Sequence, residues 1–431
     1  LGGSWNSTWD GEYWTENSPR VLVNNDLTMD FLNEIGINKN DFETVYGSFV
    51  NQNIIFLNFV SKYFNLHDIL KLTRSYLFLT DETQSVKDWM DYNDISDLGK
   101  KGLTMFCIIL NDLPEKTNAI SFFKAINPNH TLLQMKDSNK WHNLIEQKLS
   151  NMDNVYILKN TEVKKINEEN NKIVSCTCYI NSSDVVNIPG NKFILCTQSS
   201  GILPIINYSN DNVKNNWFEY EFMKKWINDT HYNGFGFQLH FTEDIPYKNE
   251  FCWSCSSYWS IIILPVSNWL YTKSKNNKIK TVWSCVIVDM DTISKRIQKT
   301  ANECNKEEII NECLYQINNI VKIPTPYKVT FSPGLKNING KWKSENTGFT
   351  KGYYDYLPMK GNIDNLFAVG SFSNIGHHKN TSTIFSSIES ASYYLNNYEI
   401  QYKGFHKKNK KYYKYFIIIM ILTIILLRTC F

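Results

Sequence analysis

The part of this chain whose residue types point most directly to chemistry lies near its C-terminus. Residues 365–369 form an apolar, strand-like run, Gly370 and Ser371 follow it, and a helical pattern begins at Thr383 and Ile384. A helix N-terminus carries free amides and a partial positive charge, so it attracts anions and electron-rich rings. A glycine after the strand lets the backbone come close to a ligand. The segment therefore predicts a site made largely by backbone, and the alternative is an ordinary strand, loop and helix.

Aromatic and sulfur-containing side chains supply further candidates. Tyr353 and Tyr354 precede this segment, and Trp342 lies a little earlier. Such side chains can line a pocket for a flat ligand, and they can equally be core or surface residues of a tyrosine-rich chain. Cys252 and Cys255 have dithiol spacing, but they lie in strand-like sequence, where the two ends would point to opposite faces. A reactive dithiol normally sits at a helix N-terminus, so this pair favours a structural role.

The histidines and the remaining cysteines predict no metal site and no disulfide framework. His377 and His378 are adjacent, and no further ligands follow at a spacing that suits a metal ion. The ten cysteines are scattered and lie mostly in apolar runs. This pattern favours free thiols in a reducing compartment.

The composition is that of a globular protein. The 431 residues are enough for two or three domains, and 42% of them are hydrophobic against 20% charged. Basic and acidic residues number 45 and 42, which gives a net charge of +3 and no argument for nucleic-acid binding.

The hydrophobic pattern changes along the chain. Mixed helical patterning is predicted from Asp26 to Phe59, where Leu27, Phe31, Leu32 and Ile35 recur at helical spacing and Gly36 is a stop. Residues 41–148 are predicted to be mainly helical. Strands are then expected at residues 154–158, 163–166, 172–180 and 193–197, and a turn at Ser199–Gly201.

The next region predicts an antiparallel sheet, because its strands follow one another without alternating helices. Strands are expected at residues 235–241, 258–266 and 281–288, and a helix at 293–321. A last strand at 365–370 and a helix at 383–395 close the ordered part of the pattern.

Three separated segments resemble the flavin amine oxidases and their phytoene desaturase relatives, a superfamily of FAD-dependent oxidoreductases. The first is Leu1-Gly2-Gly3-Ser4-Trp5. The second runs from Asn160 through Val163 to Thr197, and the third is the strand, glycine, loop and helix at 365–391. Their order and spacing match the split arrangement of this superfamily. The Gly-rich dinucleotide loop of the family would precede Leu1, so we expect the chain to start after it.

The resemblance implies roles for individual residues. FAD would be bound by Gly2, Gly3, Ser4 and Trp5 near its phosphates, by the backbone of Val163 at the adenine, and by Gly370, Ser371, Thr383 and Ile384 near the flavin. Tyr353, Tyr354 and Trp342 would face the flavin and guide the substrate. The sequence departs from the family at Ser4, where arginine is usual, at Ser371, where an acid is usual, and at Ser386-Ser387, where Gly-Ala is usual.

The implied fold class is α/β plus α+β. It combines a split FAD/NAD(P)-binding Rossmann-like domain, an inserted substrate domain of sheet plus helices, and a C-terminal hydrophobic helix. We assign residues 1–45, 150–205 and 355–400 to the FAD-binding domain and residues 46–149 and 206–354 to the substrate domain. The implied activity is the removal of a hydride from a C–N or C–C unit of a small-molecule substrate.

Two other functions remain open. The serines at expected cofactor positions suit a non-enzymatic, membrane-attached descendant of the flavoprotein fold. A thiol redox protein that uses Cys252 and Cys255 is the third reading. The sequence specifies neither the substrate nor the oligomeric state.

Residues 405–431 predict a basic linker and a transmembrane tail. A basic run at 406–411 precedes twelve residues, 416–427, that are apolar except for Thr423. This stretch is shorter than the roughly 20 residues of a full span, but flanking Lys414 and Arg428 can snorkel to the interface. The basic flank places the main domain on the cytosolic side. Membrane attachment would suit a lipophilic substrate, and the alternative is a buried C-terminal helix or an embedded hairpin.

Overall fold

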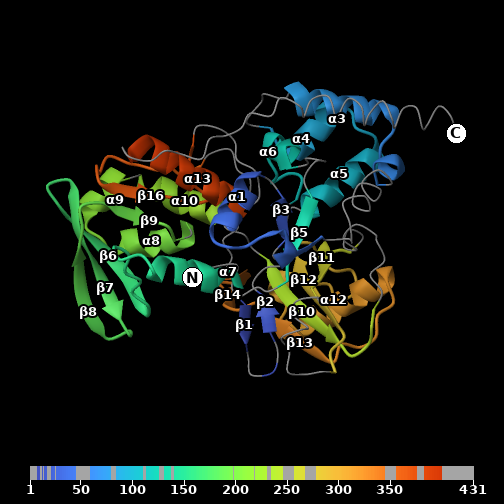
Figure 1. Cartoon of the computed structure of the whole chain (residues 1–431). Coiled ribbons are helices and arrows are strands. Elements are labelled where there is room, and N and C mark those ends of the chain that lie inside the picture. The colour runs from blue at the N-terminus through green and yellow to red at the C-terminus, as the bar shows by residue number, and fades with distance from the viewer. Residues whose placement is uncertain are drawn as a thin grey trace.

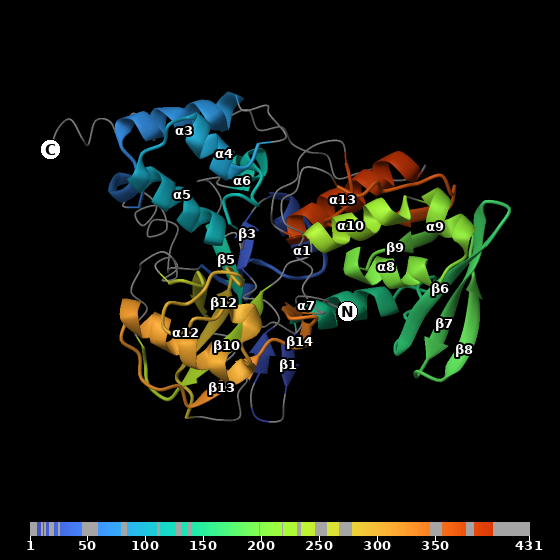
Figure 2. The same cartoon turned by 180° about the vertical axis from the view of Figure 1, so that it is seen from behind.

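The computed structural model describes residues 7–9, 12, 14–16, 21–24, 26–44, 59–78, 84–109, 113–125, 131–136, 140–197, 199–217, 219–230, 234–245, 257–266, 278–344, 356–375 and 383–399. Helices and strands mix throughout, and they gather in three groups around a small central sheet (Figure 1). Figure 2 shows the same groups from behind.

The first group is built on two parallel strands from distant parts of the chain, β9 (Phe193–Leu195) and β16 (Leu366–Ala368). Beside them runs an antiparallel meander, β6 (Thr161–Glu169), β7 (Lys172–Ile180) and β8 (Asp184–Pro189). The helices of this group are α8 (Ser199–Asn207), α9 (Asp211–Trp217), α10 (Tyr220–Thr230) and α13 (Thr383–Tyr398).

Helices cover both faces of strand β16. Leu366 and Ala368 belong to a core shared with α8, α9 and α10, whereas Phe367 and Val369 belong to a core shared with α13. Successive strand residues point to opposite faces, so a short apolar run can serve two cores at once. This three-layer packing explains why residues 366–369 carry no polar side chain.

The second group is an antiparallel sheet, as the sequence predicted. Its strands are β10 (Phe235–Phe241), β11 (Ile261–Pro265), β12 (Thr281–Ile287) and β13 (Lys328–Phe331), in the order β11-β12-β10-β13. Helix α12 (Lys306–Ile320) packs on one face, and the hairpin β14 (Leu335–Ile338) and β15 (Lys341–Ser344) adds Leu335 and Trp342 to the same core.

Helix α12 is shorter than predicted, because the stretch before it is fixed as a polar loop. Residues 301–303 form the single turn η4, and Asn305 then caps α12 by accepting a hydrogen bond from the backbone of Glu308. The carboxylate of buried Glu312 accepts hydrogen bonds from the side chains of Ser294 and Arg296. These contacts satisfy polar groups that a longer helix would have carried on its apolar face.

The third group holds α3 (Leu66–Phe78), α4 (Val86–Tyr92), α5 (Asp97–Ile109) and α6 (Ala119–Ala125) around one aromatic-rich core. Ile108 of α5 packs with Ile262 and Val288, so this group rests on the face of the antiparallel sheet opposite to α12.

The region predicted as mainly helical also contains strands, which corrects that prediction. The central sheet has the order β3-β5-β4 and consists of β3 (Val21–Asn24), β4 (Phe42–Thr44) and β5 (Thr131–Met135). Helices α1 (Asp26–Glu34) and α7 (Lys140–Ser150) cover it, and β1 (Ser7–Trp9) and β2 (Trp14–Glu16) form a separate hairpin. Strands on both sides of residue 45, the proposed domain boundary, thus meet in one sheet.

Two further local predictions are wrong. Residues 155–158 form no strand, because Tyr156 and Leu158 are exposed and no neighbouring strand pairs with them. Ser199–Gly201 is the first turn of α8 and not a chain-reversing turn. Beyond these, α1 ends at Glu34, and Gly36, with a φ of 87°, lies in the turn that stops it, as predicted.

Within the described residues no helix combines the length and the apolar character needed to cross a membrane. The predicted tail at 405–431 lies outside those residues.

Candidate functional site

The candidate site is the edge at which strands β9 and β16 both end. The two strands pair in parallel, with Leu366 opposite Phe193 and Ala368 opposite Leu195. The Phe193 amide donates to the Asn365 carbonyl over 2.8 Å, and the Val369 amide donates to the Leu195 carbonyl over 3.0 Å. In α/β sheets ligands bind outside the carboxyl ends of parallel strands. Cys196, Thr197 and Ser199, together with residues 369–371, occupy that position here.

The loop after β16 is held by its own hydrogen bonds. The Ser373 hydroxyl donates to the Ala368 carbonyl over 2.8 Å and accepts from the Gly370 amide over 2.9 Å. The Ser373 amide donates to the Gly370 carbonyl over 3.1 Å. Buried Ser373 therefore fixes the turn in which Gly370 and Ser371 lie.

Gly370 lies against the buried ring of Phe372. A Cβ atom added at Gly370 would come within 2.5 Å of Phe372 Cε1. Glycine is thus required at this position by a neighbour within the protein. The sequence had suggested that Gly370 makes room for a ligand. The ring of Phe372 gives a second reason for a glycine at this position.

A second glycine, Gly361, lets α9 pack closely against the segment that precedes β16. Residues 357–361 run beside β16, where the Ala368 amide donates to the Met359 carbonyl over 2.9 Å. A Cβ at Gly361 would lie 1.5 Å from the Trp217 carbonyl oxygen, so only glycine fits there. The neighbouring Asn362 amide donates to the Asn216 carbonyl over 3.0 Å.

Asn365 joins the meander to the parallel strands, and sequence reasoning missed this role. Its side-chain oxygen accepts from the Ile173 amide over 2.9 Å. Its side-chain nitrogen donates to the carbonyls of Ile173 over 2.7 Å and of Asn191 over 3.0 Å. One side chain therefore clips β7 to the start of β16. An asparagine just before an apolar strand was the only available signal.

Two helices start from the same edge. Helix α8 follows β9 directly, and α13 follows the loop after β16. Neither helix has an acidic residue in its first turn, unlike α9, α10 and α12. Residues 195–201 and 368–375 include no charged side chain. The helix dipoles therefore contribute positive potential beside these uncharged stretches.

The opposite end of α13 is fixed by an ion pair. Lys192, which precedes β9, lies 2.7 Å from the carboxylate of Glu399, and the Tyr394 hydroxyl donates to the same carboxylate. These two hydrogen bonds, first from Lys192 and then from Tyr394, lower the pKa of Glu399. Burial, followed by the bond to Glu399, raises the pKa of Tyr394 above its ordinary value. Phe367 stacks edge-on against Tyr394 with ring centroids 5.1 Å apart.

The described cofactor residues of the sequence prediction lie on elements of the parallel-strand group. Gly370 and Ser371 form the loop, and Thr383 and Ile384 begin α13. Val163 lies on β6 opposite Cys178 and packs against the core of the same group. Gly2, Gly3, Ser4, Trp5, Tyr353 and Tyr354 lie outside the described residues, as do Cys252, Cys255, His377 and His378.

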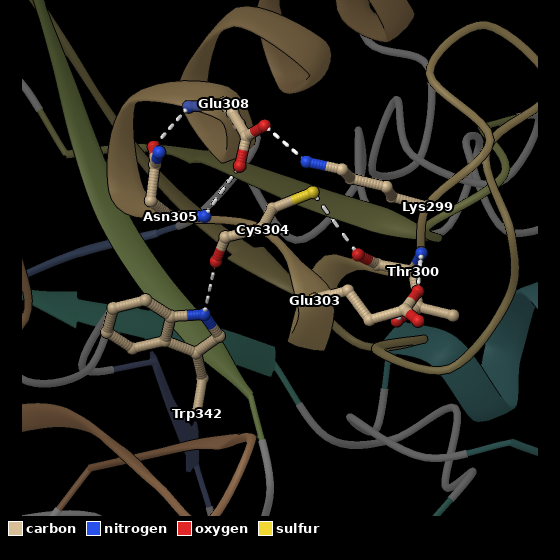
Figure 3. A network of polar contacts seen from close by, with 7 residues as sticks. All are labelled: Lys299, Thr300, Glu303, Cys304, Asn305, Glu308 and Trp342. Carbon is tan, nitrogen blue, oxygen red and sulfur yellow. Dashed lines mark hydrogen bonds and ion pairs between the residues drawn. The ribbon is translucent and has the colours of Figure 1, made fainter.

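Trp342 belongs to a different core from these residues. It lies on β15 in the antiparallel-sheet group, where its indole N–H donates to the Cys304 carbonyl over 3.1 Å (Figure 3). Its ring packs edge-on against Phe235 with centroids 5.1 Å apart. The Lys299–Glu308 ion pair and the cap of α12 lie beside it (Figure 3). Its surroundings are those of a buried core residue.

The family that the sequence resembles implies FAD, and the described edge fits an anionic dinucleotide in its electrostatics. Two helix N-termini, the stretches 195–201 and 368–375 without charged residues, and a close-packed glycine are present. Ser371 offers a hydroxyl where the family places an acid, so a ribityl or ribose hydroxyl would meet a weaker partner.

No protein-family model matches the chain, and no curated protein matches its sequence. A solved structure of an oxidoreductase from Methanosarcina mazei has a TM-score of 0.57 at 12% identity, over 90% of this chain and 91% of that one. A CLA-producing fatty acid isomerase from P. acnes has a TM-score of 0.47 at 8% identity, over 93% and 90% of the two chains, which is too low for any argument. The first similarity shows that this chain has the fold of the M. mazei oxidoreductase over nearly its whole length.

Proposed function

We propose that this chain is an FAD-dependent oxidoreductase of the amine oxidase and phytoene desaturase type. The observation that carries the proposal is the parallel pairing of β9 with β16. This pairing joins the second and third segments of the sequence resemblance, which lie far apart in the chain. A helix follows each of the two strands. The shared fold with an oxidoreductase supports the same class.

Bound FAD would supply the chemistry by accepting a hydride from a C–N or C–C unit of the substrate. The residues of this chain would bind and orient the cofactor. Gly370 and Ser371 would meet the ribityl chain, and Val163 would meet the adenine. The α13 N-terminus, at Thr383 and Ile384, would stabilise negative charge on the flavin ring. We propose Tyr353 and Tyr354 as the residues that guide the substrate.

Membrane attachment through residues 405–431 is part of the same proposal. A tail anchored there, with the main domain in the cytosol, would bring the site close to lipophilic small molecules. Fractionation of cells that express the full chain and a chain lacking residues 405–431 tests it. A full chain that stays in the soluble fraction would contradict the attachment.

The visible spectrum of the purified full-length protein, before and after dithionite, tests the cofactor. We expect flavin absorbance that bleaches on reduction. A matched pair of variants tests the role of α13. Thr383→Glu should weaken FAD binding, because the new charge opposes the anionic cofactor, whereas Asn396→Glu, at an exposed position of the same helix, should leave it unchanged.

A second candidate is a non-enzymatic descendant that keeps the fold. It is favoured by the uncharged Ser371 and by the Phe372 ring that covers Gly370. A folded, colourless protein that takes up no added FAD would support this candidate over the enzyme.

A further inference from the structure

Strand β7 carries two cysteines whose thiols touch. Cys176 and Cys178 are alternate residues of the strand, so both side chains leave the same face. Their sulfurs lie 3.6 Å apart, within hydrogen-bonding reach of each other. Cys176 is partly exposed, whereas Cys178 is 1% exposed. One accessible thiol therefore has a buried thiol as its immediate neighbour.

The backbone around this pair is irregular on one side only. On β8, Ile188 and Val186 face Cys176 and Cys178 in regular register. On β6 the register shifts between Val163, which pairs with Cys178, and Lys165, which pairs with Thr177. Such a bulge bends and twists a strand pair locally. Strand β7 can therefore adjust at the two cysteines while its pairing with β8 is kept.

We propose that Cys176 and Cys178 form a reversible redox site that closes into a disulfide within the strand when hydrogen peroxide oxidises it. The Cys176 sulfur attacks the peroxide, an S–O bond forms, the O–O bond breaks, and water leaves. The Cys178 sulfur then attacks the Cys176 sulfur, an S–S bond forms, the S–O bond breaks, and a second water leaves. Two thiols lose two protons and two electrons, and one peroxide is reduced to two waters.

The environments of the two thiols assign their order of reaction. Burial, and then the hydrogen bond with Cys176, raise the pKa of Cys178 to about 11. Cys178 therefore stays protonated near neutral pH, and the more accessible Cys176 meets the peroxide first. The Cys178 sulfur lies 3.6 Å from the Cys176 sulfur and is placed to attack the sulfenic acid, with its proton passing to the leaving hydroxyl.

The geometry of a strand makes this disulfide easy to reduce. Alternate residues of a strand have Cα atoms roughly 6.4–6.8 Å apart. Disulfides usually join Cα atoms about 4.4–6.8 Å apart, so the bond would form at the upper limit and store strain. Strained disulfides have higher reduction potentials and are the labile ones. Since Asn365 joins Ile173 of the same strand to the start of β16, closure acts on a strand that is hydrogen-bonded to the strand of the candidate site, at its other end.

Peptide mapping of the full-length protein tests the proposal. After hydrogen peroxide and then iodoacetamide, trypsin releases residues 173–192, which contain Cys176 and Cys178 and no other cysteine. We expect this peptide to lose the mass of two hydrogens and to take up no alkyl group. Dithiothreitol before alkylation should restore two alkyl groups.

The chain also contains an internal control. Residues 193–214 form a tryptic peptide whose only cysteine is Cys196, an exposed thiol. If Cys196 is oxidised while peptide 173–192 stays doubly alkylated, the proposal is overturned. It is also overturned if Cys176 gains oxygen while Cys178 is still alkylated. The folded Cys178→Ser variant, checked by circular dichroism, should instead accumulate oxygen adducts on Cys176.

Discussion

At the scale of single residues, Gly370 shows how one sequence feature can have two physical causes. A glycine between a strand and a helix suggested close approach of a ligand. The structure adds the buried ring of Phe372, which fills the space where a side chain would begin. The two causes predict different behaviour of a variant without any cofactor.

We expect Gly370→Ala to lower the free energy of unfolding of the cofactor-free protein by about 1–3 kcal/mol, because the new Cβ would overpack against Phe372. Urea unfolding measures the loss. In the double variant with Phe372→Leu the loss should be smaller than the sum of the single losses. Full stability of Gly370→Ala combined with weakened FAD binding would instead show that only the ligand requires this glycine.

Asn365 carries a second prediction at this scale. Asn365→Ala removes three hydrogen bonds and leaves the amide and carbonyl of Ile173 without their side-chain partner. We expect a loss of about 1–3 kcal/mol in the free energy of unfolding. Exposed Asn362 bonds to Asn216 and Asn171 through its backbone, so it offers the matched control Asn362→Ala, which should be near neutral. Equal losses in the free energy of unfolding of both variants would contradict the role of the Asn365 side chain in joining β7 to β16.

At the scale of elements, the ion pair between Lys192 and Glu399 ties the end of α13 to the start of β9. The pKa of Glu399 is lowered in the folded protein from its ordinary 4.5. Between the folded pKa and 4.5 the unfolded chain binds more protons than the folded one, so stability falls as the pH falls through this window.

We therefore expect Glu399→Gln to lower stability above the ordinary pKa of the carboxyl and to flatten the acid side of the stability profile. Urea midpoints measured from about pH 6 to about pH 3 give this profile. The control is Glu221→Gln, since Glu221 lies on the surface 3.9 Å from Lys224. A Glu399→Gln profile that parallels the unmodified protein would show that the ion pair contributes nothing.

Elements with a strong pattern could be predicted, and those fixed by tertiary contacts could not. β7 and β10 have the predicted bounds, because each alternates cleanly and lies next to two partner strands. Residues 154–158 are equally apolar but find no partner strand. The sequence indicated the loop of Gly370, but not the clip by Asn365 or the contact of Gly361 with Trp217. Both depend on groups far away in the chain.

At the scale of the whole molecule, the described residues have separate cores for the parallel-strand group and the antiparallel-sheet group. Leu366, Leu195 and Trp217 lie in the first core, and Trp342, Phe235 and Trp283 lie in the second. The first core draws on residues 163–227 and 357–372, with the whole antiparallel sheet inserted between these stretches. The sequence analysis predicted a split FAD-binding domain from the order of three motifs, and whether this group is that domain stays a prediction. It did not predict that α9 and α10, beyond residue 205, join the first core.

The split core predicts how the molecule opens. Leu366→Ala removes a fully buried side chain and should cost about 2–5 kcal/mol. Because regions with separate cores open as separate cooperative units, hydrogen exchange should speed up in residues 193–227 and 357–399 together, while 235–344 stays protected. Trp342→Leu should produce the reverse pattern and leave the first group protected. If Leu366→Ala speeds up exchange only in residues 357–399, the parallel pair of β9 and β16 is not one cooperative unit. The candidate site would then have no common support for its two halves.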